Sequence, residues 1–196
     1  MENIIKSEDI FRKNRVPPGQ YTVDKWPVLH YDGIPNIDMK KWRFEAFGLV
    51  ENQLNLSYEE FTSLPKVKVF ADIHCVTTWS KLDNIFEGVS SKTITDLARP
   101  LPEAKFVLLH SYDNYTTNLP LDEFLSPDVV FTYTLDGVPL TPEYGYPLRL
   151  VVPKLYFWKS PKWVKAVEFL KEDKPGFWET RGYHNHGDPW TEERYS

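Results

Sequence analysis

Cys75 is the residue with the widest range of chemistry in this chain of 196 residues, which has no other cysteine. A thiolate can attack an electrophilic carbon or bind a soft or high-valent metal ion. A lone cysteine excludes an internal disulfide. A zinc site calls for four ligands, and only His74 is adjacent in the sequence. Cys75 is therefore a nucleophile, a ligand of a metal that other groups also hold, or an inert buried thiol.

A predicted strand positions Cys75. Apolar residues alternate with polar or larger ones over residues 67–73, so a strand leads directly into His74 and Cys75. Thr77, Thr78 and Trp79 follow. Irregular backbone after a strand commonly carries reactive groups. This setting favours a position at the mouth of a pocket for Cys75.

The other predicted elements are short and do not alternate regularly. Ser57 and Glu60 form a capping-box pattern, which predicts a helix that begins after Ser57. The pattern predicts helices at residues 58–64, 93–98 and 118–125 and strands at residues 41–50, 106–109, 129–135, 148–152 and 163–169. The sequence therefore predicts a mixed, β-rich α+β single domain rather than a doubly wound parallel sheet.

The domain is expected to span residues 41–175, with a segment packed on it at each end. Residues 1–40 are rich in proline and are predicted to form an extended N-terminal segment. Residues 176–196 carry many aromatic side chains, so this C-terminal tail is predicted to pack on the domain.

Charge and hydropathy exclude two classes of partner. With a formal net charge of −5, the protein lacks the broad positive potential that proteins need to bind nucleic acids or anionic membranes. No stretch approaches the roughly 20 apolar residues that span a bilayer, and the N-terminus does not read as an export signal. We therefore expect a cytoplasmic protein without nucleic-acid or membrane partners.

Two groups of motifs give the chain a family resemblance. Residues 74–82 (HCVTTWSKL) and 86–89 (FEGV) resemble the molybdenum-ligand segment of the bacterial branch of the sulfite oxidase family, which includes a methionine-sulfoxide reductase. Three downstream motifs resemble the pterin-binding half of the same family in their order and spacing. They are residues 135–140 (LDGVPL), 144–153 (YGYPLRLVVP) and 159–164 (KSPKWV). The resemblance runs from about Arg15 to the C-terminus.

The resemblance implies the sulfite oxidase molybdopterin-binding fold and a molybdenum cofactor. Cys75 is then the protein ligand of the metal, and the cofactor performs a two-electron oxygen-atom transfer on a small substrate. Tyr112, Tyr115 and Tyr133 are candidates for the substrate mouth, and we assign Cys75 and Tyr133 as the catalytic residues. The residues expected to contact the cofactor, besides Cys75, are His30, Tyr31, Ser111, Tyr144, Arg149, Ser160, Pro161 and Lys162.

Arg149 and Lys162 suit the phosphate at the end of the pterin, because a guanidinium binds phosphate as a fork and an ammonium as a point charge. Taken alone, an arginine in an apolar strand is more often salt-bridged, and a surface lysine is more often solvated. A pair of histidines, His184 and His186, with Asp188 could chelate a metal, but hydrogen bonding or solvent exposure is the more common role of such residues.

The chain departs from the sulfite oxidases after the cysteine. Those enzymes carry paired arginines there, whereas Val76 to Ser80 include none and Lys81 is the only nearby cation. Sulfite is therefore not the expected substrate, because a small dianion needs several cationic donors. The haem and dimerisation domains of the family do not fit within this length, so we expect a monomer that exchanges electrons with a separate donor or acceptor protein.

Two alternatives use the same residues differently. Cys75 could be the nucleophile of a cysteine enzyme, with His74 or His110 as its base. The fold could also be a cofactor-free binding module that accepts a partner in an aromatic cleft.

Overall fold

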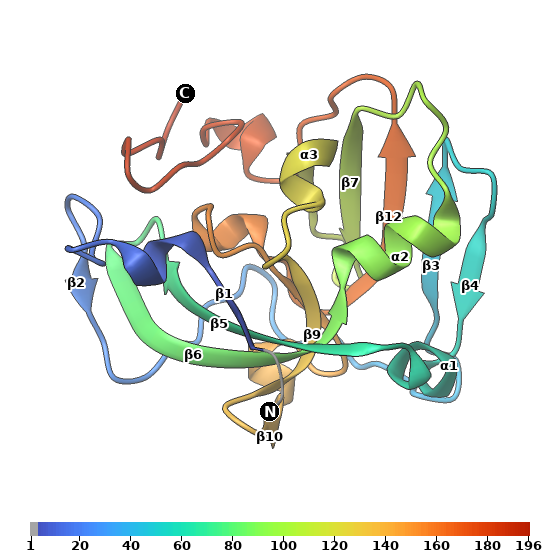
Figure 1. Cartoon of the computed structure of the whole chain (residues 1–196), viewed down its shortest axis with the longest axis horizontal. Coiled ribbons are helices and arrows are strands. Elements are labelled where there is room, and N and C mark those ends of the chain that lie inside the picture. The colour runs from blue at the N-terminus through green and yellow to red at the C-terminus, as the bar shows by residue number, and fades with distance from the viewer. Residues whose placement is uncertain (1–3) are drawn as a thin grey trace.

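Two β-sheets form the body of the molecule in the computed structural model, which describes residues 4–196 (Figure 1). The first sheet has the order β1-β5-β6-β9-β10, with β2 on β6 and β11 on β9. Its strands are β1 (Ile4–Lys6), β2 (Tyr21–Thr22), β5 (Lys66–His74), β6 (Trp79–Ser90), β9 (Val130–Leu135), β10 (Val138–Pro139) and β11 (Arg149–Val151). The long β5 and β6 pair antiparallel and form the curved floor of the molecule in Figure 1.

The second sheet has the order β4-β3-β12-β7-β8 and stands upright on the right of Figure 1. Its strands are β3 (Phe44–Gly48), β4 (Leu54–Leu56), β7 (Phe106–Ser111), β8 (Thr116–Pro120) and β12 (Val164–Leu170). The pairing of β12 with β3 is parallel, whereas β12 pairs antiparallel with β7. The mixed, β-rich architecture is the predicted fold class.

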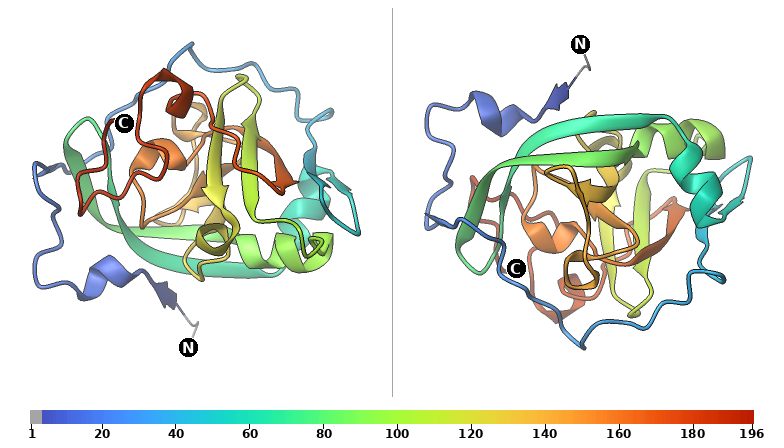
Figure 2. Two further views of the ribbon diagram at one scale, coloured as in Figure 1. Left: turned by 90° about the horizontal axis from the view of Figure 1, so that it is seen from above. Right: turned by 90° about the horizontal axis from the view of Figure 1, so that it is seen from below.

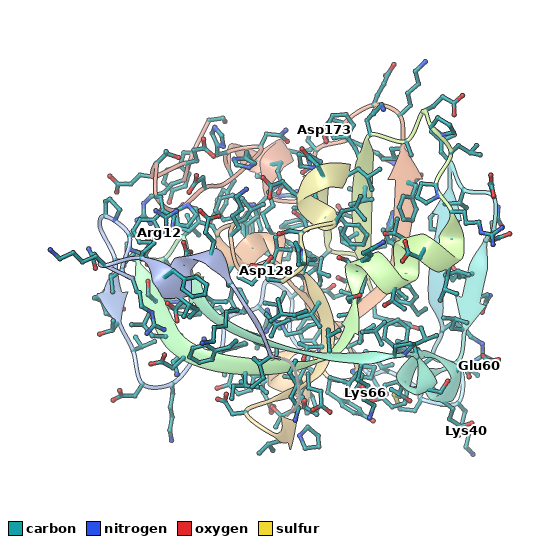
Figure 3. All side chains as sticks on the ribbon, viewed as in Figure 1. Arg12, Lys40, Glu60, Lys66, Asp128 and Asp173 are labelled. Atoms are coloured by element: carbon teal, nitrogen blue, oxygen red, sulfur yellow. The ribbon has the colours of Figure 1, made fainter. Side chains whose placement is uncertain are left out.

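The helices are short. They are α1 (Tyr58–Ser63), α2 (Ser91–Ala98) and α3 (Leu121–Phe124), with 3-10 turns η1 (Glu8–Phe11), η2 (Pro142–Tyr144), η3 (Phe157–Lys159) and η4 (Glu179–Arg181). The predicted capping box is present at α1. The Ser57 hydroxyl accepts the Glu60 N–H at 3.2 Å, and the Glu60 carboxylate, labelled in Figure 3, accepts the Ser57 N–H at 2.8 Å. No helix within residues 4–196 is long and apolar enough to cross a membrane.

The apolar side chains form two clusters on opposite faces of the first sheet. Phe131 and Tyr133 of β9 belong to the main core, where Phe44, Phe61 and Phe169 also lie. The second cluster contains Val130 of β9 together with other buried residues, among them Trp26, Ile73, Cys75, Trp79, Val151 and Tyr156. Because successive side chains of a strand point to opposite faces, neighbouring residues of β9 and β11 serve different clusters.

The structure corrects several predicted elements. Residues 118–120 are not helical, because they complete β8, and α3 is confined to Leu121–Phe124. Neither β6 nor β8 is predicted by the pattern of apolar residues. The N-terminal segment, expected to be irregular, contributes β1 and β2 by parallel pairing with β5 and β6.

Candidate active site

Cys75 lies in the four-residue connection between β5 and β6. Its N–H donates to the Trp79 carbonyl at 2.8 Å, and its carbonyl accepts the Thr78 N–H at 3.0 Å. The Thr77 hydroxyl donates to Sγ at 3.1 Å. Burial raises the pKa of the Cys75 thiol, and the hydrogen bonds from Thr77 oppose that effect. The thiol therefore sits in a closed turn at the end of the strand that the sequence predicted.

This turn forms one side of a cavity of about 400 Å³. The same cavity is lined by two cations, Arg149 and Lys162. Most of the remaining surface is aromatic, and its rings come from segments that are far apart in the sequence. The aromatic lining residues are Trp26, Tyr31, Trp79, Tyr115, Tyr144, Phe157, Trp158, Trp163, Trp178 and Tyr183.

Arg149 of β11 is almost fully buried, with 2% of its surface exposed. Its guanidinium donates to the carbonyls of Tyr144 and Ser160, both at 2.9 Å, and its Nε has no hydrogen-bond partner among the described residues. The rings of Phe157 and Trp26 lie 4.3 and 5.1 Å from it. Burial lowers the pKa of Arg149 to about 9. Carbonyl oxygens orient this cation but supply no negative charge.

Lys162 repeats this arrangement beside Arg149. Its ammonium donates to the carbonyls of Leu29 at 2.6 Å and Glu143 at 2.9 Å. Burial, together with the neighbouring charge of Arg149, lowers the pKa of Lys162 to about 8. Within residues 4–196, neither cation forms an ion pair with a carboxylate. Arg149 is buried and Lys162 is half-buried. Asp113 and Glu143 line the same cavity and attract Lys162 without pairing with it directly. Two adjacent cations without a directly paired carboxylate make this part of the cavity suited to an anion.

This sequence is similar to the sequences of known proteins. The family described as "Oxidoreductase molybdopterin binding domain" matches residues 31–178. An uncharacterized oxidoreductase, YuiH, of Bacillus subtilis is 46% identical over 97% of both chains. The chain belongs to the molybdopterin-binding oxidoreductase family. Its fold is also that of the sulfane dehydrogenase SoxCD of Paracoccus pantotrophus, with a TM-score of 0.67 and 22% identity over 73% of this chain and 41% of the other.

A further relative is named for its activity. The protein-methionine-sulfoxide reductase catalytic subunit MsrP of Campylobacter jejuni is 29% identical over 92% of this chain and 66% of its own length. The chain thus spans nearly all of the Bacillus relative but about two thirds of the reductase subunit.

The cavity fits the group that gives the family its description. A molybdopterin carries a phosphate at one end and sulfur-bound metal at the other. The unneutralised Arg149 and Lys162, with the partnerless Nε of Arg149, suit an anionic terminus. The only thiol of the chain lies in the same cavity. The donor set is therefore compatible with both ends of such a cofactor.

Most residues that the sequence predicted for the cofactor meet in this cavity, and they come from four separate segments. The Tyr144 hydroxyl donates to the Trp26 carbonyl at 3.0 Å, and the Ser160 hydroxyl accepts the Val152 N–H at 2.9 Å. The predicted residues that line the cavity are His30, Tyr31, Cys75, Tyr144, Arg149, Ser160, Pro161 and Lys162.

Tyr133 and Ser111 are not among the residues lining the cavity, and these two predictions need correction. Tyr133 shares a face of β9 with Phe131 and packs in the main core. Ser111 is buried at the end of β7, in step with Val107 and Leu109 of the same core. Strand alternation turns both side chains toward the main core. Two other tyrosines were candidates for the substrate mouth. Tyr115 lines the cavity, whereas the Tyr112 hydroxyl is hydrogen-bonded to the backbone of Arg43.

The histidines proposed as bases for a Cys75 nucleophile have other partners. Nδ1 of His74 is hydrogen-bonded to Ser80 at 2.8 Å, and its Nε2 lies 3.5 Å from Asp9. His110 belongs to the second sheet and contacts Glu168 at 3.0 Å. The structure thus supplies no base beside Cys75 from either position.

The C-terminal histidines are also engaged. Nδ1 of His184 accepts the N–H groups of His186 and Gly187, and His186 is hydrogen-bonded to Glu193 at 2.8 Å. No group of three or more potential metal-ligating side chains occurs in the described part of the chain. The hydrogen-bonding role expected for these histidines is the one observed.

Sequence reasoning missed the aromatic residues that enclose the site. Trp26 and Phe157 flank Arg149, while Trp178 and Tyr183 stack at 4.9 Å and reach the cavity from the tail. The high aromatic content of 15% is the only general signal for such walls, and it does not identify the members.

Proposed function

We propose that the chain is a molybdenum-dependent oxidoreductase that performs two-electron oxygen-atom transfer on a small substrate. The observation that carries the proposal is the single thiol in one cavity with two adjacent cations that form no ion pair with a described carboxylate. In this assignment Cys75 binds the metal and Arg149 and Lys162 bind the phosphate. When bound, the cofactor supplies the oxygen-atom and electron exchange.

The remaining cavity residues orient the cofactor and exclude water. Tyr144 and Ser160 have backbone carbonyls that fix the Arg149 guanidinium. The rings of Trp26 and Phe157 remove this guanidinium from water, which strengthens its attraction for an anion. His30, Tyr31 and Pro161 complete the walls.

The substrate proposed here is neutral rather than sulfite. At the Cys75 side the cavity is lined by Val76, Thr77 and Trp79, and the Lys81 ammonium is bound to the Leu82 carbonyl. The two cations of the lining, Arg149 and Lys162, are assigned to the cofactor. The Arg194 guanidinium also lies near Cys75, but it donates to the carbonyls of Val76 and Pro18. A small dianion would therefore find few free donors beside Cys75. A separate protein is proposed as electron donor or acceptor, in keeping with the designation of the Campylobacter relative as a catalytic subunit.

Metal and pterin analysis tests this function. Protein purified from a host that makes the cofactor should contain about one molybdenum and one pterin per chain. C75S should abolish turnover while retaining part of the pterin through Arg149, whereas R149M should lose pterin and metal together. The proposal would be refuted if wild-type protein contained no molybdenum and showed no pterin fluorescence.

A further inference from the structure

The turn that carries Cys75 is held by side chains from both ends of the chain. Gln20 donates from Nε2 to the Cys75 carbonyl at 3.1 Å. Arg194 donates from Nη1 to the Val76 carbonyl at 2.6 Å. Both residues lie outside the segment 31–178 that matches the family. These contacts come from outside the matched segment, and they converge on the backbone of the proposed metal ligand.

The two terminal segments also contact each other beside this turn. Nη2 of Arg194 donates to the Pro18 carbonyl at 3.4 Å. A Cβ built at Gly19 would lie 2.9 Å from Oε1 of Glu192 and 3.2 Å from Nη2 of Arg194. Figures 1 and 2 show the C-terminal tail, the chain around β2 and the β5–β6 turn side by side. The segments thus close around the turn rather than merely passing near it.

Further contacts fix the orientation of the two segments. The Arg194 guanidinium lies 5.0 Å from the ring of Tyr156, and only 15% of its side chain is exposed. Arg12, labelled in Figure 3, lies over the ring of Trp190 at 4.1 Å. A guanidinium that is stacked and hydrogen-bonded to carbonyls at once has little freedom to leave.

We propose that residues 18–20 and 192–194 form a terminal clasp that fixes the Cys75–Val76 backbone, with Arg194 as its positioning residue. The functional meaning of the clasp rests on the proposed role of Cys75 as the metal ligand. A ligand held before the cofactor arrives does not have to be ordered during binding. The clasp therefore preorganises the thiol.

Amide hydrogen exchange on cofactor-free protein tests the clasp. The reporters are the amides of Cys75 and Thr78, which donate to Trp79 and Cys75 within the turn. In R194A both should exchange at least about tenfold faster than in wild type, because the loss of a charged hydrogen bond favours opening of the turn. R194K, which keeps a charged donor but loses the planar guanidinium that stacks on Tyr156, should give exchange rates between those of R194A and wild type.

A matched arginine variant controls for general weakening of the tail. Arg181 also donates to a carbonyl, that of Phe177, at 2.8 Å and lies over an aromatic ring at 3.6 Å, but it does not touch the Cys75 turn. R181A should leave the two reporter amides within about twofold of wild type.

A glycine pair tests the clasp from its other segment. Gly19 has φ +67° and faces Arg194, whereas Gly137 has φ +78° and nothing within 4 Å of a built Cβ. G19A should accelerate exchange at Cys75 and Thr78 less than R194A does, because the ends of the Glu192 and Arg194 side chains can shift, while G137A, with similar backbone strain, should leave exchange unchanged. Unchanged exchange at both amides in folded R194A would overturn the clasp.

Measurements on the loaded enzyme separate the clasp from the proposed function. In protein that contains molybdenum, R194A should shift the thiolate-to-metal absorption band and lower kcat more than it raises KM. R194K should reverse both changes in part. Absence of molybdenum from wild type would contradict the proposed function, yet the exchange results on cofactor-free protein would still decide the clasp.

Discussion

At the scale of single residues, the site depends on cations that the protein orients but does not neutralise. Arg149 and Lys162 each donate to two backbone carbonyls and lie close enough that one lowers the pKa of the other. This arrangement costs free energy in the cofactor-free protein, because buried charge is unfavourable without a counter-charge. A bound anion relieves that cost.

The pH dependence of cofactor retention follows from Lys162. Its pKa of about 8 is below the usual value for lysine, so the ammonium loses its proton as pH rises through this range. A bound anion favours the charged form, so retention should be strongest below pH 8 and fall above it. The pterin phosphate stays dianionic there, so the change belongs to the protein.

K162R keeps its charge and should retain molybdenum at pH 9 better than wild type after equal dialysis. K162M should retain it poorly at every pH, by about tenfold or more for the loss of a charged hydrogen bond. Molybdenum analysis before and after dialysis provides the readout. Equal retention by wild type and K162R at pH 9 would contradict the assignment of Lys162.

The predicted residues that line the cavity stand in motifs of a resemblance, as Cys75 and Arg149 do. Ser111 and Tyr133 lie outside the cavity lining for one reason. A motif position does not say which face of a strand a side chain occupies, and both strands turn these residues toward the main core. The aromatic wall residues were missed because Trp26 and Tyr183 come from irregular segments without periodicity.

At the scale of elements, β6 shows why the longest strand escaped prediction. It contains Asp83, Asn84 and Gly88, residue types that strands disfavour. The first two occupy positions with a special backbone or hydrogen-bonding role. Asp83 adopts a left-handed backbone with φ +60°, and the Asn84 amide donates to the carbonyls of Ala71 and Lys81. By contrast, β5 contains a single residue of this kind, Asp72, and its alternating pattern was predicted closely.

Gly88 permits the closest approach between β6 and β9. A Cβ built there would lie 1.9 Å from the Phe131 carbonyl oxygen, at a register shift between the two strands. Backbone atoms cannot yield as a flexible side chain can, so G88A should lower the free energy of unfolding by at least ~3 kcal/mol. Urea denaturation measures this loss. G137A should cost only about 1 kcal/mol, from its left-handed backbone alone. Equal losses would refute the steric explanation.

At the scale of the whole molecule, the cavity joins both ends of the chain to the middle. Its lining begins at Trp26 and ends at Tyr183. The tail is anchored by a buried ion pair, in which Lys159 lies 2.7 Å from Glu179. The Glu179 carboxylate also accepts the Trp158 indole N–H at 2.9 Å. Composition predicted that the tail packs on the domain, but no pattern in the sequence identifies these partners.

The buried pair should behave as a unit on mutation. E179Q and K159M each leave an unpaired buried group, and each should cost about 3–5 kcal/mol of unfolding free energy. The double variant K159M/E179Q should cost clearly less than the sum of the two single variants. Urea denaturation of all four proteins completes the cycle. Additive losses would show that the pair contributes no coupling.

The terminal clasp also sets an order of events during synthesis. Gln20 is made before any residue that lines the cavity, and Arg194 is made after all of them. A chain still attached to the ribosome can therefore fold both sheets while the Cys75 turn is held from one side only. Newly made protein passes through a stage with nearly complete walls and a turn that is not yet secured. That stage ends when Arg194 can reach the turn.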